Sequence, residues 1–113
     1  MPHRFTVGVE EEFQIVDPAT WELRSHVAQL LEPGATALGE RIRPELHQSI
    51  VEVGTTVCAN ASELEAQVRH IRRELTSAAE SRGLAIAAAG THAFSHWVDQ
   101  DISSGDRYAH IVE

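Results

Sequence analysis

The sequence predicts one small domain of the α+β or α/β class, and three observations indicate this. A helical repeat of apolar residues over residues 62–82 lies between two segments of strand-like composition, residues 46–57 and 84–89. Residues 5–16 form a third such segment, in which apolar and polar side chains alternate. A β-helix-β unit at the centre of a chain of 113 residues is typical of a small mixed domain.

The first strand-like segment carries three consecutive glutamates, at positions 10–12. Alternation divides the segment into an apolar and a polar face, formed by Phe5, Val7, Val9, Phe13 and Ile15 and by Thr6, Gly8, Glu10, Glu12 and Gln14. Glu11 falls on the apolar face, where a lone charge is costly, so it requires a bulge, a strand end or a basic partner. A helical stripe is the alternative, but the β-branched residues and the following Asp17-Pro18 favour a strand.

The next elements are short. The pattern predicts a turn at residues 17–20, a brief returning strand at 21–23, and a helix that Ser25 caps and that ends at Pro33-Gly34. A loop is expected at residues 35–40.

The strand predicted at residues 46–57 is rich in β-branched residues. Glu52 shares its face of this strand with apolar neighbours such as Leu46 and Ile50. A carboxylate in that setting requires a basic partner or a metal ion.

The central helix has clear boundary signals. Ser62 and Glu65 have the spacing of a capping box, and Arg82-Gly83 is typical of a helix end. One face is apolar, formed by Leu64, Val68, Ile71, Leu75 and Ala78. The exposed arginines at positions 69, 72 and 73 are expected to pair with Glu65 and Glu74.

The C-terminal part of the chain is mixed in character. A strand of small residues at 84–89 leads to Gly90-Thr91-His92, and residues 103–105 form a turn. Asp106 is predicted to cap a final helix that carries Arg107.

The composition narrows the classes of function. A formal net charge of −8 argues against a nucleic acid or an anionic membrane as partner, and no apolar run is long enough to span a bilayer. The absence of lysine excludes lysine-based catalysis within these residues. Cys58 is the only cysteine and is expected to be a packing residue. No signal-peptide pattern precedes the first glutamate, so we expect a cytoplasmic protein.

Two groups of residues have the character of metal ligands. Glu10 and Glu12 lie on one strand face, and neighbouring carboxylates repel each other unless a cation such as Mg²⁺ or Mn²⁺ lies between them. The alternative is a solvated polar face. His92 and His96 are four residues apart and would share one face of a helix as zinc ligands, or else belong to a loop or a helix entrance.

The motifs occur in a characteristic order, which is Gly8-Val9-Glu10-Glu11-Glu12-Phe13, Ile50-Val51-Glu52-Val53-Gly54-Thr55, Ala89-Gly90-Thr91-His92 and Arg107-Tyr108. This ordered set resembles glutamate–cysteine ligase family 2, the carboxylate–amine ligases, from about Val7 to Arg107. The resemblance implies an α+β, glutamine synthetase-like catalytic fold, which is mainly an antiparallel sheet with flanking helices.

The resemblance also implies an activity and its ligands. ATP and Mg²⁺, or Mn²⁺, would serve the joining of the γ-carboxylate of glutamate to an amine such as that of cysteine through an acyl phosphate. Glu10, Glu12 and Glu52 match the metal-binding positions of the family. His92 and Arg107 are expected in the substrate or nucleotide pocket, where Arg107 would bind a carboxylate or a phosphate. The alternative for Arg107 is a surface salt bridge. Glu45 is a weaker metal candidate because it lies seven residues before Glu52, and a regular strand would point the two oppositely.

Family members are several times longer than this chain, so residues 1–113 are expected to be the N-terminal portion of such a ligase domain. We then expect little or no activity from these residues alone, and unpaired sheet edges that favour a homo-oligomer. Two other functions stay open. One is a non-catalytic remnant or interaction module. The other is a small metal-dependent hydrolase that uses His92 and His96.

Overall fold

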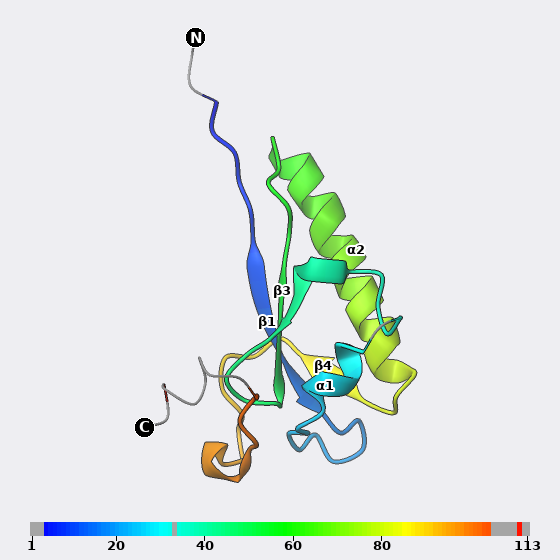
Figure 1. Ribbon diagram of the computed structural model, residues 1–113, viewed down its shortest axis with the longest axis vertical. Coiled ribbons are helices and arrows are strands. Elements are labelled where there is room, and N and C mark those ends of the chain that lie inside the picture. The colour runs from blue at the N-terminus through cyan, green and yellow to red at the C-terminus, as the bar shows by residue number, and fades with distance from the viewer. Residues whose placement is uncertain (1–3, 33, 105–110, 112–113) are drawn as a thin grey trace.

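The computed structural model describes residues 4–32, 34–104 and 111, and it is built on a four-stranded antiparallel sheet (Figure 1). The strand order is β2-β3-β1-β4, with strands β1 (Glu10–Val16), β2 (Ile42–Pro44), β3 (Ile50–Gly54) and β4 (Ala85–Ala87). Every pairing is antiparallel, and β1 has a partner on both sides. The sheet confirms the predicted α+β class.

Two α-helices and two 3₁₀-helices complete the described structure: α1 (Val27–Leu30), η1 (Gly39–Arg41), α2 (Ala61–Glu80) and η2 (Trp97–Asp99). Helix α2 connects β3 to β4. Because both of these strands are antiparallel to β1, they run parallel to each other with β1 between them. This arrangement is a split form of the predicted β-helix-β unit.

The core lies between helix α2 and one face of the sheet, along which the helix runs (Figure 1). The alternation of β1 puts Phe13 and Ile15 on this face, and β3 contributes Val51 and Val53. The helix supplies the buried residues Ile71, Leu75, Ala78 and Ala79. The predicted apolar stripe of the helix is confirmed, although Leu64 and Val68 near its start are only half-buried.

Helix α2 begins earlier than the capping box at Ser62 predicted. Asn60 is the N-cap, and its side-chain oxygen accepts a hydrogen bond of 2.9 Å from the N–H of Glu63. The carboxylate of Glu63 in turn accepts from the N–H of Ala59 at 2.8 Å. The capping-box spacing occurs twice in this sequence, and the first pair, Asn60 and Glu63, begins the helix. Glu65 is therefore free to form its ion pair with Arg69. The predicted stop is confirmed, since Gly83 has a positive φ of 69°.

The first strand is shorter at its start than expected. Strand β1 begins at Glu10, and before it Val7 makes only an isolated bridge to Cys58. Beyond Gly54, the end of β3, the two segments stay hydrogen-bonded, because the N–H of Thr55 donates to the carbonyl of Val9 at 2.9 Å. Between these contacts and the bridge, Thr56 and Val57 lie on one side and Gly8 alone on the other, so regular strand pairing ends here. Phe5, which was predicted on the apolar face, is 86% exposed.

Several other boundaries differ from the expectation. The short helix is capped at His26, and the hydroxyl of Ser25 instead accepts from the N–H of Asp101 at 3.3 Å. Strand β2 was not predicted, because three residues that end in proline give too little pattern. The predicted strands at 46–57 and 84–89 shorten to β3 and β4. The final helix from Asp106 lies outside the described residues, except for Ile111.

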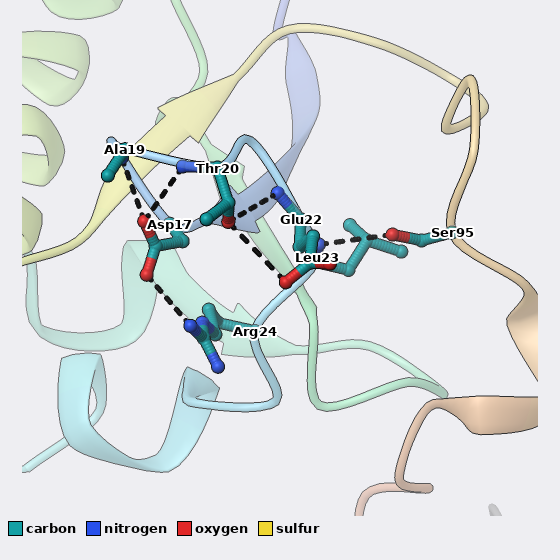
Figure 2. Close-up of polar contacts among 7 residues, drawn as sticks. All are labelled: Asp17, Ala19, Thr20, Glu22, Leu23, Arg24 and Ser95. Atoms are coloured by element: carbon teal, nitrogen blue, oxygen red, sulfur yellow. Dashed lines mark hydrogen bonds and ion pairs between the residues drawn. The ribbon is translucent and has the colours of Figure 1, made fainter.

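The turn after β1 is closed by the side chain of Asp17 (Figure 2). One carboxylate oxygen accepts from the N–H groups of Ala19 and Thr20 at 2.8 and 3.1 Å, and the other contacts Arg24 at 2.8 Å. The returning strand expected at residues 21–23 is reduced to a single bridge between Val16 and Leu23. The Arg24 guanidinium, together with the two backbone N–H groups, lowers the pKa of Asp17 to about 2.

Glu11 lies on the face of β1 that helix α2 covers, and it has a basic partner there. Nε and Nη2 of Arg72 donate to its two carboxylate oxygens at 3.0 and 2.6 Å. The side chain of Glu11 is 21% exposed, and the paired charge raises the pKa of Arg72. Of the three arrangements predicted to accommodate Glu11, a basic partner is therefore confirmed. The ion pair links strand β1 to helix α2.

The first prediction concerns this ion pair. Arg72→Ala should lower the free energy of unfolding by about 1 kcal/mol, because it leaves a largely covered carboxylate without its bidentate partner. The control is Arg69→Ala, which removes an exposed i,i+4 pair and should cost at most about 0.5 kcal/mol. Urea unfolding followed by circular dichroism measures both. Equal losses would show that the contact with Glu11 has no special weight.

The second prediction concerns acid stability. Because the pKa of Asp17 is about 2 in the folded chain and about 3.8 when unperturbed, its contribution is present above pH 4 and is lost as the pH falls toward 2. Asp17→Asn keeps an oxygen for the turn but loses the charge. Its melting temperature should therefore lie below that of the wild type at pH 6 and converge with it near pH 2. Asp99→Asn is the control. A difference that persists at pH 2 would contradict the assignment.

Candidate metal centre

The face of the sheet opposite helix α2 carries a row of charged side chains from three strands. In the register, Glu12 of β1 lies opposite Glu52 of β3, which in turn lies opposite Arg43 of β2. Glu10 lies opposite Gly54, one step further along the same face. Antiparallel pairing puts directly opposite side chains about 5 Å apart at Cβ. The sheet itself therefore brings together acids that are far apart in the sequence.

Glu45 belongs to the same group, which corrects an expectation from the sequence. Counting residues along one strand pointed Glu45 away from Glu52. The chain instead reverses between β2 and β3, and Glu45 follows Arg43 by two residues, which returns it to the face of Glu52. One carboxylate oxygen from each of Glu12, Glu45 and Glu52 lies within 4.8 Å of the others. We call these three residues the acidic cluster.

The side chain of Glu52 is 18% exposed, against 69% for that of Glu10. Burial raises its pKa, and so do a hydrogen bond with Glu45 and the charges of Glu10 and Glu45, while the charge of Arg43 opposes the rise. The charge of Arg43 thus does not offset the combined effect of burial and of the neighbouring acids. Oxygen ligands from a rigid sheet with excess negative charge fit Mg²⁺ or Mn²⁺.

Arg43 is the basic residue of this face, and it contacts two of the acids. Its Nη2 lies 3.1 Å from a carboxylate oxygen of Glu10 and 3.1 Å from one of Glu52. A Cβ atom at Gly54 would lie 3.4 Å from that nitrogen and 3.6 Å from Cγ of Glu10, so the glycine leaves room for the contact. Of the three predicted ligands, Glu12 and Glu52 join the acidic cluster, while Glu10 lies beside it and pairs with Arg43.

Sequence reasoning missed Arg43. The apolar setting of Glu52 indicated that a partner or a metal was needed, but not which residue would supply it. The strand that carries Arg43 has three residues and pairs only with β3, so no local pattern marks it.

His92 lines a cavity together with Gln14 and Thr91, and it also has a structural role in the fold. Its Nδ1 accepts from the N–H groups of Ser95 and Phe94 at 3.0 and 3.3 Å, so its Nε2 is the protonated nitrogen and donates to the carbonyl of Trp21 at 2.6 Å. The ring therefore holds the 90–95 loop against the turn after β1. Its expected place in a substrate or nucleotide pocket stays a prediction.

The remaining candidates are placed as follows. His96 is exposed, and in the described part of the chain neither it nor His92 joins a group of three ligating side chains. The predicted role of Arg107 lies outside the described residues. Cys58 is fully buried, which agrees with its predicted packing role. Among the described helices, none has the length and apolar character needed to cross a bilayer.

The fold and the acidic cluster define an α+β domain with a candidate divalent-cation site on the open face of its sheet. The chain belongs to glutamate–cysteine ligase family 2, because the sequence model of that family matches residues 6–113. This confirms the resemblance found in the motifs.

Curated relatives agree with this assignment. A protein of Chloroflexus aggregans named "Putative glutamate--cysteine ligase 2" is 53% identical over 108 residues, which cover 96% of this chain and 28% of that protein. Proteins with the same name from Herpetosiphon aurantiacus and Sorangium cellulosum are 51% and 53% identical, over 99% and 97% of this chain. The chain spans 29% and 30% of their respective lengths.

The third prediction tests the electrostatics of the cluster without any metal. Because the pKa of Glu52 is raised, the folded chain holds this proton more tightly than the unfolded chain, and stability falls as the pH rises above the ordinary value of 4.5. Glu52→Gln should therefore raise the melting temperature at pH 7 in the presence of a chelator. The gain should vanish below about pH 4, where the carboxyl is protonated in both states. A destabilised variant at pH 7 would show that the Arg43 pair dominates instead.

Proposed function

We propose that this chain supplies the Mg²⁺- or Mn²⁺-binding acids of an ATP-dependent carboxylate–amine ligase of the glutamate–cysteine type. The main support is the convergence of Glu12, Glu45 and Glu52 within 4.8 Å on one sheet face, in a chain that belongs to this ligase family. We revise the ligand set suggested by the sequence accordingly. Glu45 takes the third position, and Glu10 acts beside the cluster through Arg43.

The proposed reaction has two steps. A γ-carboxylate oxygen of glutamate attacks the terminal phosphorus of ATP, and the bond to ADP breaks, which gives an acyl phosphate. The amine then attacks the acyl carbon and loses a proton, and phosphate leaves with the electrons of the C–O bond. Both steps bring anions together, so a bound divalent cation would offset their charge.

The residues of the chain have separate roles in this proposal. Glu12 and Glu52 hold the cation from two paired strands, so their spacing is fixed by the sheet rather than by a loop. Glu45 would supply the third carboxylate ligand. The N–H of Leu46 donates to its Oε1 at 2.8 Å, which orients the carboxylate. Arg43 is half-exposed beside the cluster and is suited to contact a phosphate oxygen there.

The partners in this proposal are small molecules, namely ATP, glutamate and an amine such as cysteine. A cytoplasmic location, a homo-oligomer and the absence of a nucleic-acid partner stay predictions from the sequence. A carboxylate- or phosphate-binding role of Arg107 also stays a prediction.

One observation favours a second candidate, a non-catalytic module. Arg43 already pairs with Glu10 and Glu52, so a cation is not the only means of neutralising these acids. The hydrolase alternative has weaker support, because both ring nitrogens of His92 are engaged with the backbone of neighbouring segments.

The fourth prediction separates the ligase from the non-catalytic module. Isothermal titration of Mg²⁺ should show one saturable site per chain, and Glu12→Gln and Glu52→Gln should each weaken it by about tenfold or more, because each removes one charged oxygen ligand. The matched control is Glu65→Gln, which replaces an exposed acid on helix α2 and should leave the affinity unchanged.

ATP should bind in the presence of Mg²⁺ and lose its affinity in the same two variants. A wild-type chain that binds no Mg²⁺, or variants that bind it as tightly as the wild type, would favour the non-catalytic module.

A further inference from the structure

A cavity of about 310 Å³ lies on the same face of the sheet as the acidic cluster. Its floor includes Gln14 of β1 and Ile50 of β3, which lie opposite each other in the register. The pair Glu12 and Glu52 is the next pair along this face, two residues away on each strand. Two residues of a strand span about 6.8 Å, so the cavity and the cluster are direct neighbours. We call it the Gln14 cavity.

Two of the polar residues that line this cavity are almost entirely covered by the protein. Gln14 is 5% exposed and Ser49 is 1% exposed. Gln14 lies in β1 and Ser49 directly precedes β3, and these are the two inner strands of the sheet. A few polar groups held rigidly among apolar walls, here those of Leu23 and Ile50, are typical of a small-molecule site.

The far wall is formed by the segment after β4, and hydrogen bonds hold it in place. His92 binds the carbonyl of Trp21, and the hydroxyl of Ser95 accepts from the N–H of Leu23 at 3.3 Å (Figure 2). Further along, the carbonyl of Asp101 accepts from the N–H of Gln48 at 2.7 Å. The cavity is therefore framed by contacts between distant parts of the chain.

The chemistry of the lining differs from that of the neighbouring cluster. None of the ten described lining residues is an arginine, lysine, aspartate or glutamate. Amide, hydroxyl and imidazole groups supply its polar surface, mainly from Gln14, His47, Ser49 and Thr91. A zwitterion placed wholly inside would leave its charges unpaired, which is costly, whereas an uncharged hydrogen-bonding group would not.

We propose that the Gln14 cavity binds the uncharged, hydrogen-bonding moiety of a substrate whose charged part extends to the acidic cluster. This inference rests on the proposed ligase function and adds a substrate subsite to it. Two substrates have such a moiety: the nucleoside of ATP, and the uncharged side chain of the amine acceptor. In either case the cavity recognises the neutral group, while a cation bound by the acidic cluster would offset the negative charge of the reacting groups.

The fifth prediction tests the cavity by ligands that need no metal. Adenosine, L-cysteine and L-glutamate are titrated separately into the ¹⁵N-labelled chain in the presence of a chelator. Adenosine or L-cysteine should shift the backbone amides of Ser49 and Thr91 and the side-chain amide of Gln14. Gln14→Leu should weaken that binding by about three- to tenfold, as expected for the loss of one buried hydrogen bond.

Matched variants make the result specific. Gln29→Leu makes the same exchange on helix α1, outside the cavity lining, and should leave the affinity unchanged. Thr91→Val is a second lining variant at an exposed position, which serves if Gln14→Leu does not fold. The compound that shifts these amides, adenosine or L-cysteine, identifies the substrate that the cavity binds.

The inference would be overturned if neither adenosine nor L-cysteine shifted these amides, or if both lining variants left the binding unchanged. L-Glutamate as the sole ligand would also overturn it, because its side-chain carboxylate does not suit a lining without arginine or lysine. Glu52→Gln separates this test from that of the proposed function, since it should weaken Mg²⁺ binding about tenfold or more and leave binding in the cavity intact.

Discussion

The pairing of β1 with β3 is the interaction on which the rest of the structure depends. It is antiparallel, central to the sheet, and fixed in a register that puts Glu12 opposite Glu52 and Phe13 opposite Val51. A shift by one residue would turn the acids into the core and the apolar side chains into solvent. The burial of Phe13 and Val51 under helix α2 therefore fixes the acids on the open face. The stability of the core and the geometry of the candidate site come from the same register.

This arrangement concentrates negative charge, and the fold compensates part of it. Arg72 of helix α2 holds Glu11 on the covered face, and Arg43 of β2 contacts Glu10 and Glu52 on the open face. The carboxylates of the open face nevertheless outnumber Arg43, and such an excess of negative charge would suit a divalent cation. Burial is the main cause that raises the pKa of Glu52.

The open face of the sheet combines two kinds of surface within a few residues. Glu12 and Glu52 mark its acidic part, and Gln14 and Ile50 mark the floor of the adjacent uncharged cavity. In the proposed ligase, the first would act on phosphates and carboxylates and the second would recognise a neutral group. The close spacing follows from the pleat, because alternate residues of one strand face the same side.

Features that depend on local periodicity could be predicted from the amino-acid order alone. Alternation put Glu10 and Glu12 on one face and Glu11 on the other, with a basic partner as one of three devices that could accommodate it. The 3.6-residue repeat likewise identified the buried face of helix α2. Contacts between residues far apart in the sequence could be found only in the folded chain. The chain reverses direction between β2 and β3, so counting residues along one strand gives the wrong face for Glu45, which in fact joins the cluster. Arg43 comes from β2, a strand too short to show a pattern in the sequence. Local spacing fixes the direction of a side chain, but long-range pairing of strands fixes its neighbours.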